Sequence, residues 1–404
     1  MRFCMVTTFY PPYHFGGDAT YVRALSRALA ARGHTVDVVH CEDAFRLAGR
    51  APSSAESRSE QGIVVHRLKS RWGALSSLIT QQTGRPGLKA AALRDLLNQN
   101  FDVVNFHNIS LVGGPGVLRY SRAPVTLYTL HEHWLLCPTH IFWKDRTHAC
   151  DSKQCIRCSV RSGIPPQWWR YTGLIPRSIV GVDRFLSPSE FTAQRHREAG
   201  IAPVQVLPLF SFLDPAAGAA QVTPARPSFL FVGRVTASKG IHNLLAQFAK
   251  LPNYDLVVVG DGDLRASLEQ QYARHANIRF IGAIPQQDLI ALYREATALV
   301  FPSLAPETFG LSIAEAFACG TPAIVRDAGG SRELIDATGG GMVYQTDEEL
   351  LKALHQLAGD TVLRAQLGQR ARAGYEQHYT QEKHVEAYLA CVDEIREQKA
   401  LAVN

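Results

Sequence analysis

The chain has 404 residues, of which 46% are hydrophobic and 19% are charged. It is long enough to bury two hydrophobic cores, and its length predicts two or three domains. It has no run of about 18 apolar residues that would predict a membrane-spanning helix. Its first residues also lack the pattern of a secretion signal, so we expect a cytoplasmic protein.

The formal net charge of +6 is unevenly distributed. Residues 1–210 carry 25 Lys and Arg against 14 Asp and Glu, a net +11, whereas residues 211–404 carry 17 against 22, a net −5. The basic half predicts an anionic partner, either a phosphorylated, acidic or lipid-linked acceptor or the inner face of the plasma membrane, with the protein bound peripherally. An arginine-rich solvated surface would explain the same composition. We expect no nucleic-acid partner, because no aromatic-basic recognition module is present.

Strands and helices alternate along the first half of the chain. A helix is predicted at 19–32, and residues 42–61, rich in Ser, Ala, Arg and Glu, are predicted to form an exposed loop. This alternation predicts a parallel, doubly wound sheet with ligands at the carboxyl ends of its strands. Strands are predicted at 2–8, 35–40, 62–69, 101–106, 124–130, 185–188 and 204–209.

Candidate binding groups follow two of these strands. Gly16 and Gly17 lie between the first strand and its helix, where adjacent glycines let backbone amides approach a phosphate. His131 follows strand 124–130 and is the stronger histidine candidate, with His133 second. Both features are weak signals taken alone.

Cys137, Cys150, Cys155 and Cys158 lie within an insertion at 134–163. In a cytosolic protein such a cluster predicts a metal site rather than disulfides, and structural Zn²⁺ is the leading interpretation. His140 or His148 is able to replace one thiolate. The spacing does not match iron–sulfur ferredoxins, and four reduced cysteines without metal are the remaining alternative.

Residues 165–171, Pro-Pro-Gln-Trp-Trp-Arg-Tyr, place rings beside a cation. Such residues stack on a sugar, lie at a membrane interface, or simply pack in the core, and core packing is slightly favoured. The small-residue and proline-rich stretch 211–227 predicts an interdomain linker.

Two cations mark the start of the second half. A strand ends at Gly233, Arg234 follows it, and Lys239 lies in the loop just before the next helix. Cations at this position neutralise a diphosphate and the charge that grows on it as it leaves.

The strongest motif is Pro306 to Pro322. It follows the apolar run 297–302 and opens into a helix, with Glu307 before the helix and Glu315 two turns inside it. Free amides at a helix start bind anions or hydroxyl oxygens. One segment thus reaches two separated parts of a polar ligand, which suits a nucleotide sugar.

Glu307 and Glu315, with seven residues between them, resemble the E-x7-E segment of the retaining glycosyltransferases of family 4. That resemblance covers essentially the whole chain, and the cysteine insertion and residues 42–61 are its least typical parts. It implies the GT-B fold, an α/β architecture of two Rossmann-like, doubly wound domains that face each other across a cleft.

The resemblance also implies roles for individual residues. Arg234 and Lys239 would bind the donor phosphates, and His131, followed here by Glu132 where Asp is more frequent, would lie near the donor sugar. Glu307 would hold the sugar hydroxyls and Glu315 the ribose. The amides of Phe309, Gly310 and Leu311 would assist Glu307, Gly16 and Gly17 would contact the diphosphate, and Ile284 would lie where the base is read.

The predicted organisation is an acceptor-binding domain at 1–210, the linker at 211–227, a nucleotide-sugar-binding domain at 228–381, and a C-terminal helix at 382–404 that crosses back to the first domain. The predicted activity is retaining transfer of a hexose from a UDP- or GDP-sugar to an acceptor hydroxyl, without a catalytic metal. Its setting would be cell-surface polysaccharide, glycolipid or natural-product glycoside synthesis. A sugar-nucleotide synthase or epimerase is a second enzymatic interpretation, and a catalytically silent, zinc-stabilised scaffold subunit of a glycan or lipid assembly complex is the alternative from another class.

Overall fold

The computed structural model of the chain describes residues 1–14, 16–47, 60–213, 215 and 226–403. These residues form two compact units. The first comprises Met1–His140, Gln154–Leu207 and Val385–Asn404, and the second comprises Ile141–Lys153 and Pro208–His384. Most of the predicted linker at 211–227 lies outside the described residues.

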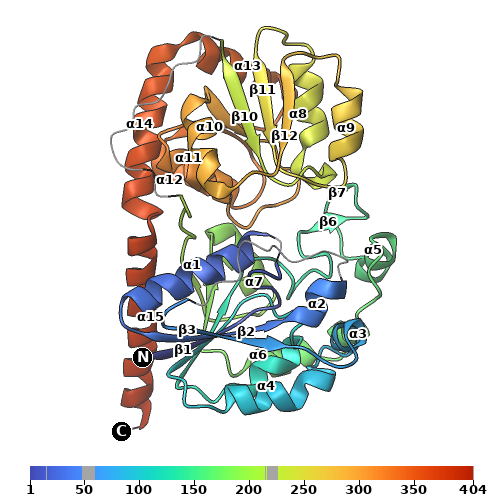
Figure 1. Cartoon of the computed structure of the whole chain (residues 1–404), viewed down its shortest axis with the longest axis vertical. Coiled ribbons are helices and arrows are strands. Elements are labelled where there is room, and N and C mark those ends of the chain that lie inside the picture. Colours follow the sequence, from blue (N-terminus) through green and yellow to red (C-terminus); the bar gives the residue numbers. More distant parts are fainter. Residues whose placement is uncertain (15, 48–59, 214, 216–225, 404) are drawn as a thin grey trace. The chain divides into compact units, whose positions relative to one another are not determined.

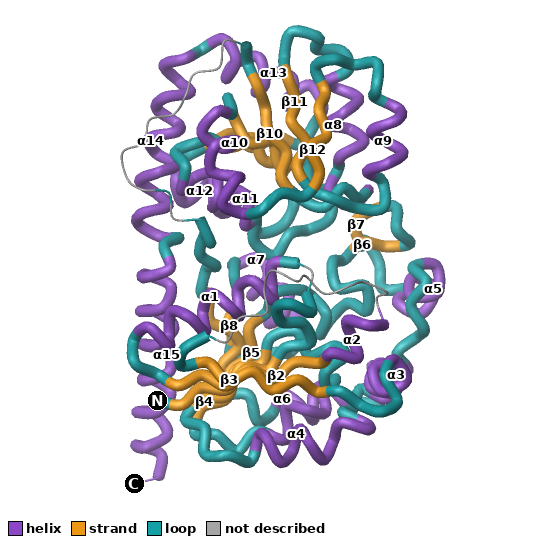
Figure 2. Tube along the Cα trace, viewed as in Figure 1, coloured by secondary structure: helices purple, strands orange, loops and turns teal. Residues whose placement is uncertain are grey.

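The first unit is built on a parallel sheet (Figure 2). Its inner strands are buried apolar runs because helices cover both faces of the sheet. The strand order reverses between β1 and β4, which places a topological switch point at their carboxyl ends. In spatial order the strands are β3 (Ile63–Leu68), β2 (Thr35–Cys41), β1 (Arg2–Val6), β4 (Val103–Phe106), β5 (Val125–Thr129), β8 (Arg184–Ser187) and β9 (Val204–Val206).

Helices and short 3-10 turns connect these strands (Figure 1). The C-terminal part of α15 (Gln381–Val403) packs on this unit, where Asn105 Nδ2 donates to Tyr388 Oη at 3.2 Å. The other elements are α1 (Gly17–Ala31), α2 (Glu42–Leu47), α3 (Ala74–Thr83), η2 (Gly87–Lys89), α4 (Ala90–Leu97), η3 (Pro115–Tyr120), α5 (Cys155–Arg161), η4 (Trp168–Tyr171), α6 (Leu174–Ile179) and α7 (Glu190–Glu198).

The prediction of an exposed loop at 42–61 is wrong for residues 42–47. Residues 42–47 form α2, and Glu42, Asp43 and Phe45 are buried there. The helix forms because Phe45 joins the core of the unit, while the Glu42 carboxylate pairs with Arg46 one turn later. Residues 48–59 lie outside the described part of the chain.

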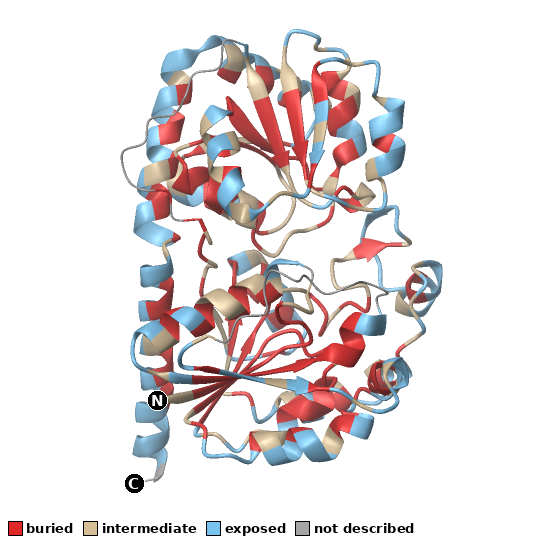
Figure 3. Cartoon of the chain, in the orientation of Figure 1, coloured by how far each residue is buried: buried red, intermediate tan, exposed pale blue. Residues whose placement is uncertain are grey.

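The second unit repeats the architecture. Alternate residues of its strands enter different hydrophobic clusters, Phe229 and Phe231 on one face and Leu230 on the other, so both faces of the sheet are covered (Figure 3). The strand order reverses between β10 and β13. In spatial order the strands are β12 (Ile278–Gly282), β11 (Asp255–Val259), β10 (Ser228–Val232), β13 (Ala298–Phe301), β14 (Ala323–Arg326) and β15 (Gly341–Tyr344).

The helices of this unit follow the strands in the usual alternation, and a separate antiparallel pair, β6 (Trp143–Lys144) and β7 (His148–Ala149), belongs to its segment 141–153. No helix among the described residues is both long enough and apolar enough to cross a bilayer. The helical elements are η5 (Ala237–Lys239), α8 (Ile241–Phe248), α9 (Arg265–Gln271), η6 (Gln286–Asp288), α10 (Leu289–Glu295), α11 (Leu311–Ala318), α12 (Ser331–Thr338), α13 (Asp347–Gly359) and α14 (Thr361–His378). The two Rossmann-like sheets confirm the predicted α/β fold class.

Candidate active site

The switch point of the second sheet brings together the strongest predicted residues. Lys239 lies in η5 after β10, and Glu307 follows the neighbouring β13. Lys239 Nζ lies 2.6 Å from Glu307 Oε1, and Ser303 Oγ donates to the same carboxylate oxygen. Residues 68 positions apart in the chain therefore form one polar cluster.

Arg234 follows β10 at the same edge of the sheet. Its side chain is exposed and forms no ion pair with any residue in the described part of the chain. An exposed guanidinium that follows the central strand of a parallel sheet is available to an anionic ligand at the carboxyl edge.

The backbone of Glu307 is fixed by a second segment. Glu307 N–H donates to Ala328 O at 3.2 Å, and Gly330 N–H donates to Glu307 O at 2.7 Å. Gly329 pairs with Glu307 in an isolated parallel bridge and has a φ of +77°, which favours glycine. The position of the carboxylate thus depends on the turn after β14.

Helix α11 begins at Leu311, directly after Gly310, whose φ is +136°. The first amides of a helix have no carbonyl partner within it, so this end attracts anions or hydroxyl oxygens. Phe309 is buried and packs against Tyr379 with ring centroids 5.7 Å apart, which anchors the turn.

Glu315 lies within α11 and is only 5% exposed. Its carboxylate accepts hydrogen bonds from Gln286 Nε2 at 2.9 Å and from Tyr293 Oη at 3.0 Å. Burial raises the pKa of Glu315 from 4.5 to about 7, although both hydrogen bonds act in the opposite direction. Gln286 follows the loop that contains Ile284, so the residues predicted to contact base and ribose are linked.

Glu315→Gln is expected to make the stability of the protein less dependent on pH. The folded-state pKa of about 7 lies above the ordinary value of 4.5. The stabilising contribution of the proton is therefore complete below pH 4.5 and is lost as the pH rises through about 7. The loss approaches about 3 kcal/mol. In thermal melts of both proteins across this pH range, the stability of the wild type should fall relative to that of the variant as the pH rises.

Glu348 offers a matched control, because its side chain is exposed on α13. Glu348→Gln should leave the pH profile of stability unchanged. If the profiles of Glu315→Gln and wild type ran parallel, the buried carboxyl would not be the source of the effect.

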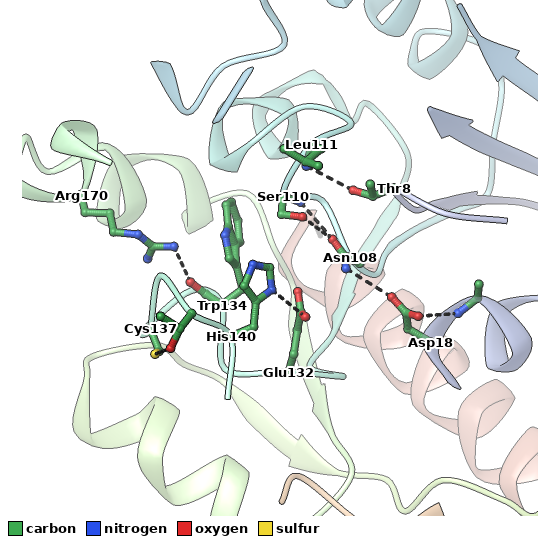
Figure 4. Close-up of polar contacts among 12 residues, drawn as sticks. Thr8, Asp18, Asn108, Ser110, Leu111, Glu132, Trp134, Cys137, His140 and Arg170 are labelled. Atoms are coloured by element: carbon green, nitrogen blue, oxygen red, sulfur yellow. Dashed lines mark hydrogen bonds and ion pairs between the residues drawn. The ribbon is translucent and has the colours of Figure 1, made fainter. Parts of the chain in front are cut away.

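The switch point of the first sheet carries a second polar cluster. Gly16 is the N-cap residue of α1, with a φ of +101°, and Gly17 and Asp18 open the helix. Asn108, which follows β4, donates from Nδ2 to Asp18 Oδ2 at 3.2 Å (Figure 4). Burial, followed by the charge of Glu132, raises the pKa of Asp18 to about 6.

Asn108 is held rigidly in this arrangement. Its Oδ1 accepts hydrogen bonds from the backbone N–H and the hydroxyl of Ser110, at 3.2 and 2.7 Å. Thr8 Oγ1, in the loop after β1, accepts from the amide of Leu111 (Figure 4) and from that of Val112. The loop after β4 is therefore fixed against the loop after β1.

His131 lies beside this cluster, after β5, in contact with a second histidine. His107 Nδ1 and His131 Nε2 are 3.0 Å apart, and their rings stack with centroids separated by 5.2 Å. Tyr21 of α1 contacts the His131 ring edge-on at 4.8 Å. Burial, followed by the neighbouring His131, lowers the pKa of His107 well below its ordinary value, so His107 is neutral and its tautomer fixes that of His131.

The sequence prediction named His131 and both glycines but missed Asp18, His107 and Asn108. His107 and Asn108 are the first two residues after the predicted strand 101–106, and Asp18 follows the glycine pair, which is the signal that would have identified them. His133, the weaker candidate, is buried, and burial together with His196 lowers its pKa to about 3. It is a core residue.

The aromatic segment 165–171 divides between core and surface. Arg170 donates to Trp134 O at 2.8 Å (Figure 4). It also donates to Leu135 O at 3.2 Å, and its guanidinium lies 4.7 Å from the centre of the Trp169 ring. Trp169 is buried, as the favoured interpretation requires, whereas Trp168 is 59% exposed.

Two of the four cysteines of the predicted zinc site, Cys155 and Cys158, lie one turn apart on α5. Cys137 is buried and Cys150 is exposed. Among the residues that the structure describes, no group of three or more His, Cys, Asp or Glu is placed to hold a metal ion. The zinc site stays a prediction, and we derive no chemistry from it.

Comparison with known proteins identifies the family. Residues 15–210 match the model of Glycosyltransferase Family 4, and residues 220–374 match that of Glycosyl transferases group 1. An uncharacterized glycosyltransferase, MJ1607, of Methanocaldococcus jannaschii is 33% identical over 357 residues, which cover 83% of each chain. A glycogen synthase of Mycobacterium tuberculosis is 28% identical over 369 residues, covering 83% of this chain and 80% of its own.

The fold comparison agrees. Alr3699/HepE from Anabaena, crystallised in complex with UDP, superimposes with a TM-score of 0.62 over 100% of this chain and 99% of its own, at 19% identity. The chain therefore belongs to the GT-B glycosyltransferases that combine a family 4 domain with a group 1 domain.

Proposed function

We propose that this glycosyltransferase moves a hexose, with retention of configuration, from a UDP- or GDP-sugar to a hydroxyl of an acceptor bound by the first unit. The observation that carries the proposal is the cluster of Lys239, Glu307 and Ser303 at the switch point of the second sheet. Parallel sheets of this type bind their ligands at that edge.

The ion pair between Lys239 and Glu307 suits a site that exchanges partners when its ligand arrives. Without ligand, each charge neutralises the other at 2.6 Å. A diphosphate would attract Lys239 Nζ together with the exposed Arg234, and Glu307 would then accept hydrogen bonds from sugar hydroxyls. Amides at the start of α11 would hold the same hydroxyls or the phosphate.

The nucleoside would lie between α11 and the loop after β12. Glu315 would accept the ribose hydroxyls, and the backbone near Ile284 would contact the base. Gln286 supports both, because it donates to Glu315 from the helix that follows Ile284.

In the proposed mechanism the configuration of the anomeric carbon is retained, because the acceptor attacks the same face of the sugar that the diphosphate leaves. The acceptor oxygen forms the new bond to the anomeric carbon as the bond to the phosphate oxygen breaks, and a departing phosphate oxygen takes the acceptor proton. Arg234 and Lys239 would stabilise the charge that develops on this leaving group. Glu307 and His131 would position the sugar.

The acceptor is proposed to be an anionic, glycan or lipid-linked molecule, in keeping with the net +11 of residues 1–210. The M. tuberculosis relative is named as a glycogen synthase, which supports a glycan. Asp18 is suited to accept a hydrogen bond from an acceptor hydroxyl, since its carboxyl lies at the start of α1.

A thermal-shift panel of UDP, GDP, ADP and TDP tests the donor class, on protein whose zinc content has been measured. A nucleotide at about a hundred times its dissociation constant adds roughly 2.7 kcal/mol of stability, a visible rise in melting temperature. We expect UDP or GDP to produce it, and Glu315→Gln to reduce it. A flat panel in folded protein would favour the silent scaffold instead.

A further inference from the structure

Helix α3 has its polar and apolar faces reversed. The buried side chains of this helix are Ser76, Ser77, Thr80 and Gln81, all polar, whereas Leu75 and Leu78 are 45% and 40% exposed. A surface helix of a globular domain normally buries its apolar stripe and exposes its polar one. Both the burial of the polar side chains and the exposure of the apolar ones therefore need a physical cause.

Hydrogen bonds account for the inner face. Lys89 is buried, and its Nζ donates to Ser76 O at 3.2 Å, to Ser76 Oγ at 3.2 Å and to Thr80 Oγ1 at 2.9 Å. Gln81 Nε2 donates to Pro165 O at 2.9 Å, and Gln81 O accepts from Trp169 Nε1 at 2.8 Å. The polar face is therefore fixed against η2 and the segment around η4, so the apolar face has to point outward.

The elements next to α3 in the first unit expose further apolar side chains. Trp72 precedes α3, Leu88 lies in the contacting turn η2, and Trp168 and Tyr171 lie in η4, which packs against α3. Their exposed fractions lie between 48% and 62%. Large apolar groups gathered on neighbouring elements mark an interaction surface. We call this set the apolar surface: Trp72, Leu75, Leu78, Leu88, Trp168 and Tyr171.

Basic residues predominate in the two segments that carry the apolar surface. Residues 61–94 contain six Lys and Arg, and residues 152–182 contain five, with no Asp or Glu in either segment. Arg71 and Arg85 flank α3, both exposed, and neither forms an ion pair with a described residue. Such a surface is complementary to a negatively charged partner.

We propose that the apolar surface docks on a membrane that contains anionic lipids, with α3 lying in the interface. Trp and Tyr suit the headgroup region because each ring has an apolar body and a polar edge. Arg71 and Arg85 would contact lipid phosphates while Leu75 and Leu78 enter the acyl boundary. The apolar groups are interspersed with cations, which favours a bilayer over the less charged core of a protein interface.

Flotation with vesicles tests this docking without any donor or acceptor, so the result is independent of the proposed transfer reaction. We expect the full-length protein to float with phosphatidylcholine vesicles that contain phosphatidylglycerol and to remain unbound with phosphatidylcholine alone. Arg71→Gln and Arg85→Gln should each weaken binding about fivefold. Trp72→Ser combined with Leu78→Ser should weaken it about tenfold or more.

Two exposed residues of the second unit serve as matched controls. Val362 is 65% exposed at the start of α14, and Arg274 is exposed after α9. Val362→Ser and Arg274→Gln should bind vesicles as the wild type does, and circular dichroism melts should be alike for all variants.

Three results would overturn the proposal. The first is failure of the wild type to float with anionic vesicles at low salt, and the second is equal binding to neutral vesicles. The third is a dimer in solution that Trp72→Ser and Leu78→Ser dissociate and that binds no vesicles, since the apolar surface would then contact a second copy of the chain.

Discussion

Lys239→Ala is expected to lower kcat by about two to three orders of magnitude, with a much smaller change in KM for the donor. The loss of one well-placed charge that acts on a developing anion has this size in comparable sites. An interaction that strengthens only as the leaving group departs affects turnover more than binding. Steady-state kinetics with the donor class identified by the nucleotide panel separate the two constants.

Lys250 provides a control, since it is exposed near the end of α8 and its Nζ donates to Gln247 Oε1 at 3.4 Å. Lys250→Ala should retain wild-type kinetics. Because Lys239 and Glu307 share an ion pair, the effects of Lys239→Ala and Glu307→Gln should not be additive in the double variant. Wild-type kcat in Lys239→Ala would remove Lys239 from the proposed mechanism.

The fold was predictable because buried parallel strands produce apolar runs, and their alternation with helices admits few topologies. The same regularity explains why two of the predicted site residues lie together. Lys239 and Glu307 both follow strands, and strands that are adjacent in a doubly wound sheet bring their carboxyl ends together. The sequence did not disclose that the two side chains pair at 2.6 Å, because that contact depends on the loops.

Departures from the predictions occur where tertiary contacts outweigh local composition. Residues 42–47 were predicted to be part of an exposed loop, yet Glu42 and Asp43 are buried. Arg46 pairs with the Glu42 carboxylate and the Ser70 backbone N–H donates to the Asp43 carboxylate, which offsets the cost of burying these charges. Helix α3 is reversed because Lys89 supplies a buried cation to its polar face. The order of polar and apolar residues along the chain does not reveal which residues become partners in the folded protein.

The histidine pair shows a related limit. His131 was predicted from its place after a strand, but its orientation is determined by His107, which follows the neighbouring strand and lies 3.0 Å away. His107 Nε2 is buried without a hydrogen-bond partner among the described residues. A buried N–H donor without a partner is costlier than a bare ring nitrogen, so the proton of His107 resides on Nδ1 and is donated to His131.

Gly329→Ala is expected to reduce activity about a hundredfold, although Gly329 itself carries no functional group. A Cβ at this position would lie 2.5 Å from Glu307 O and 2.6 Å from Glu307 N, closer than any real contact. The segment that holds Glu307 must therefore shift. A displacement of about 1 Å at a positioning group costs roughly two orders of magnitude in rate.

Gly339 offers a control that separates the effect of this clash from the effect of backbone strain. It also has a left-handed φ, +63°, but its nearest neighbour to a Cβ is the flexible Arg370 side chain at 3.5 Å. Gly339→Ala should lose about 1 to 2 kcal/mol of stability and keep wild-type kcat. Gly329→Ala should lose more stability in urea unfolding and nearly all of its activity. Equal activity in the two variants would mean that the turn after β14 does not position Glu307, and that the carboxylate holds its place through Lys239 and Ser303 alone.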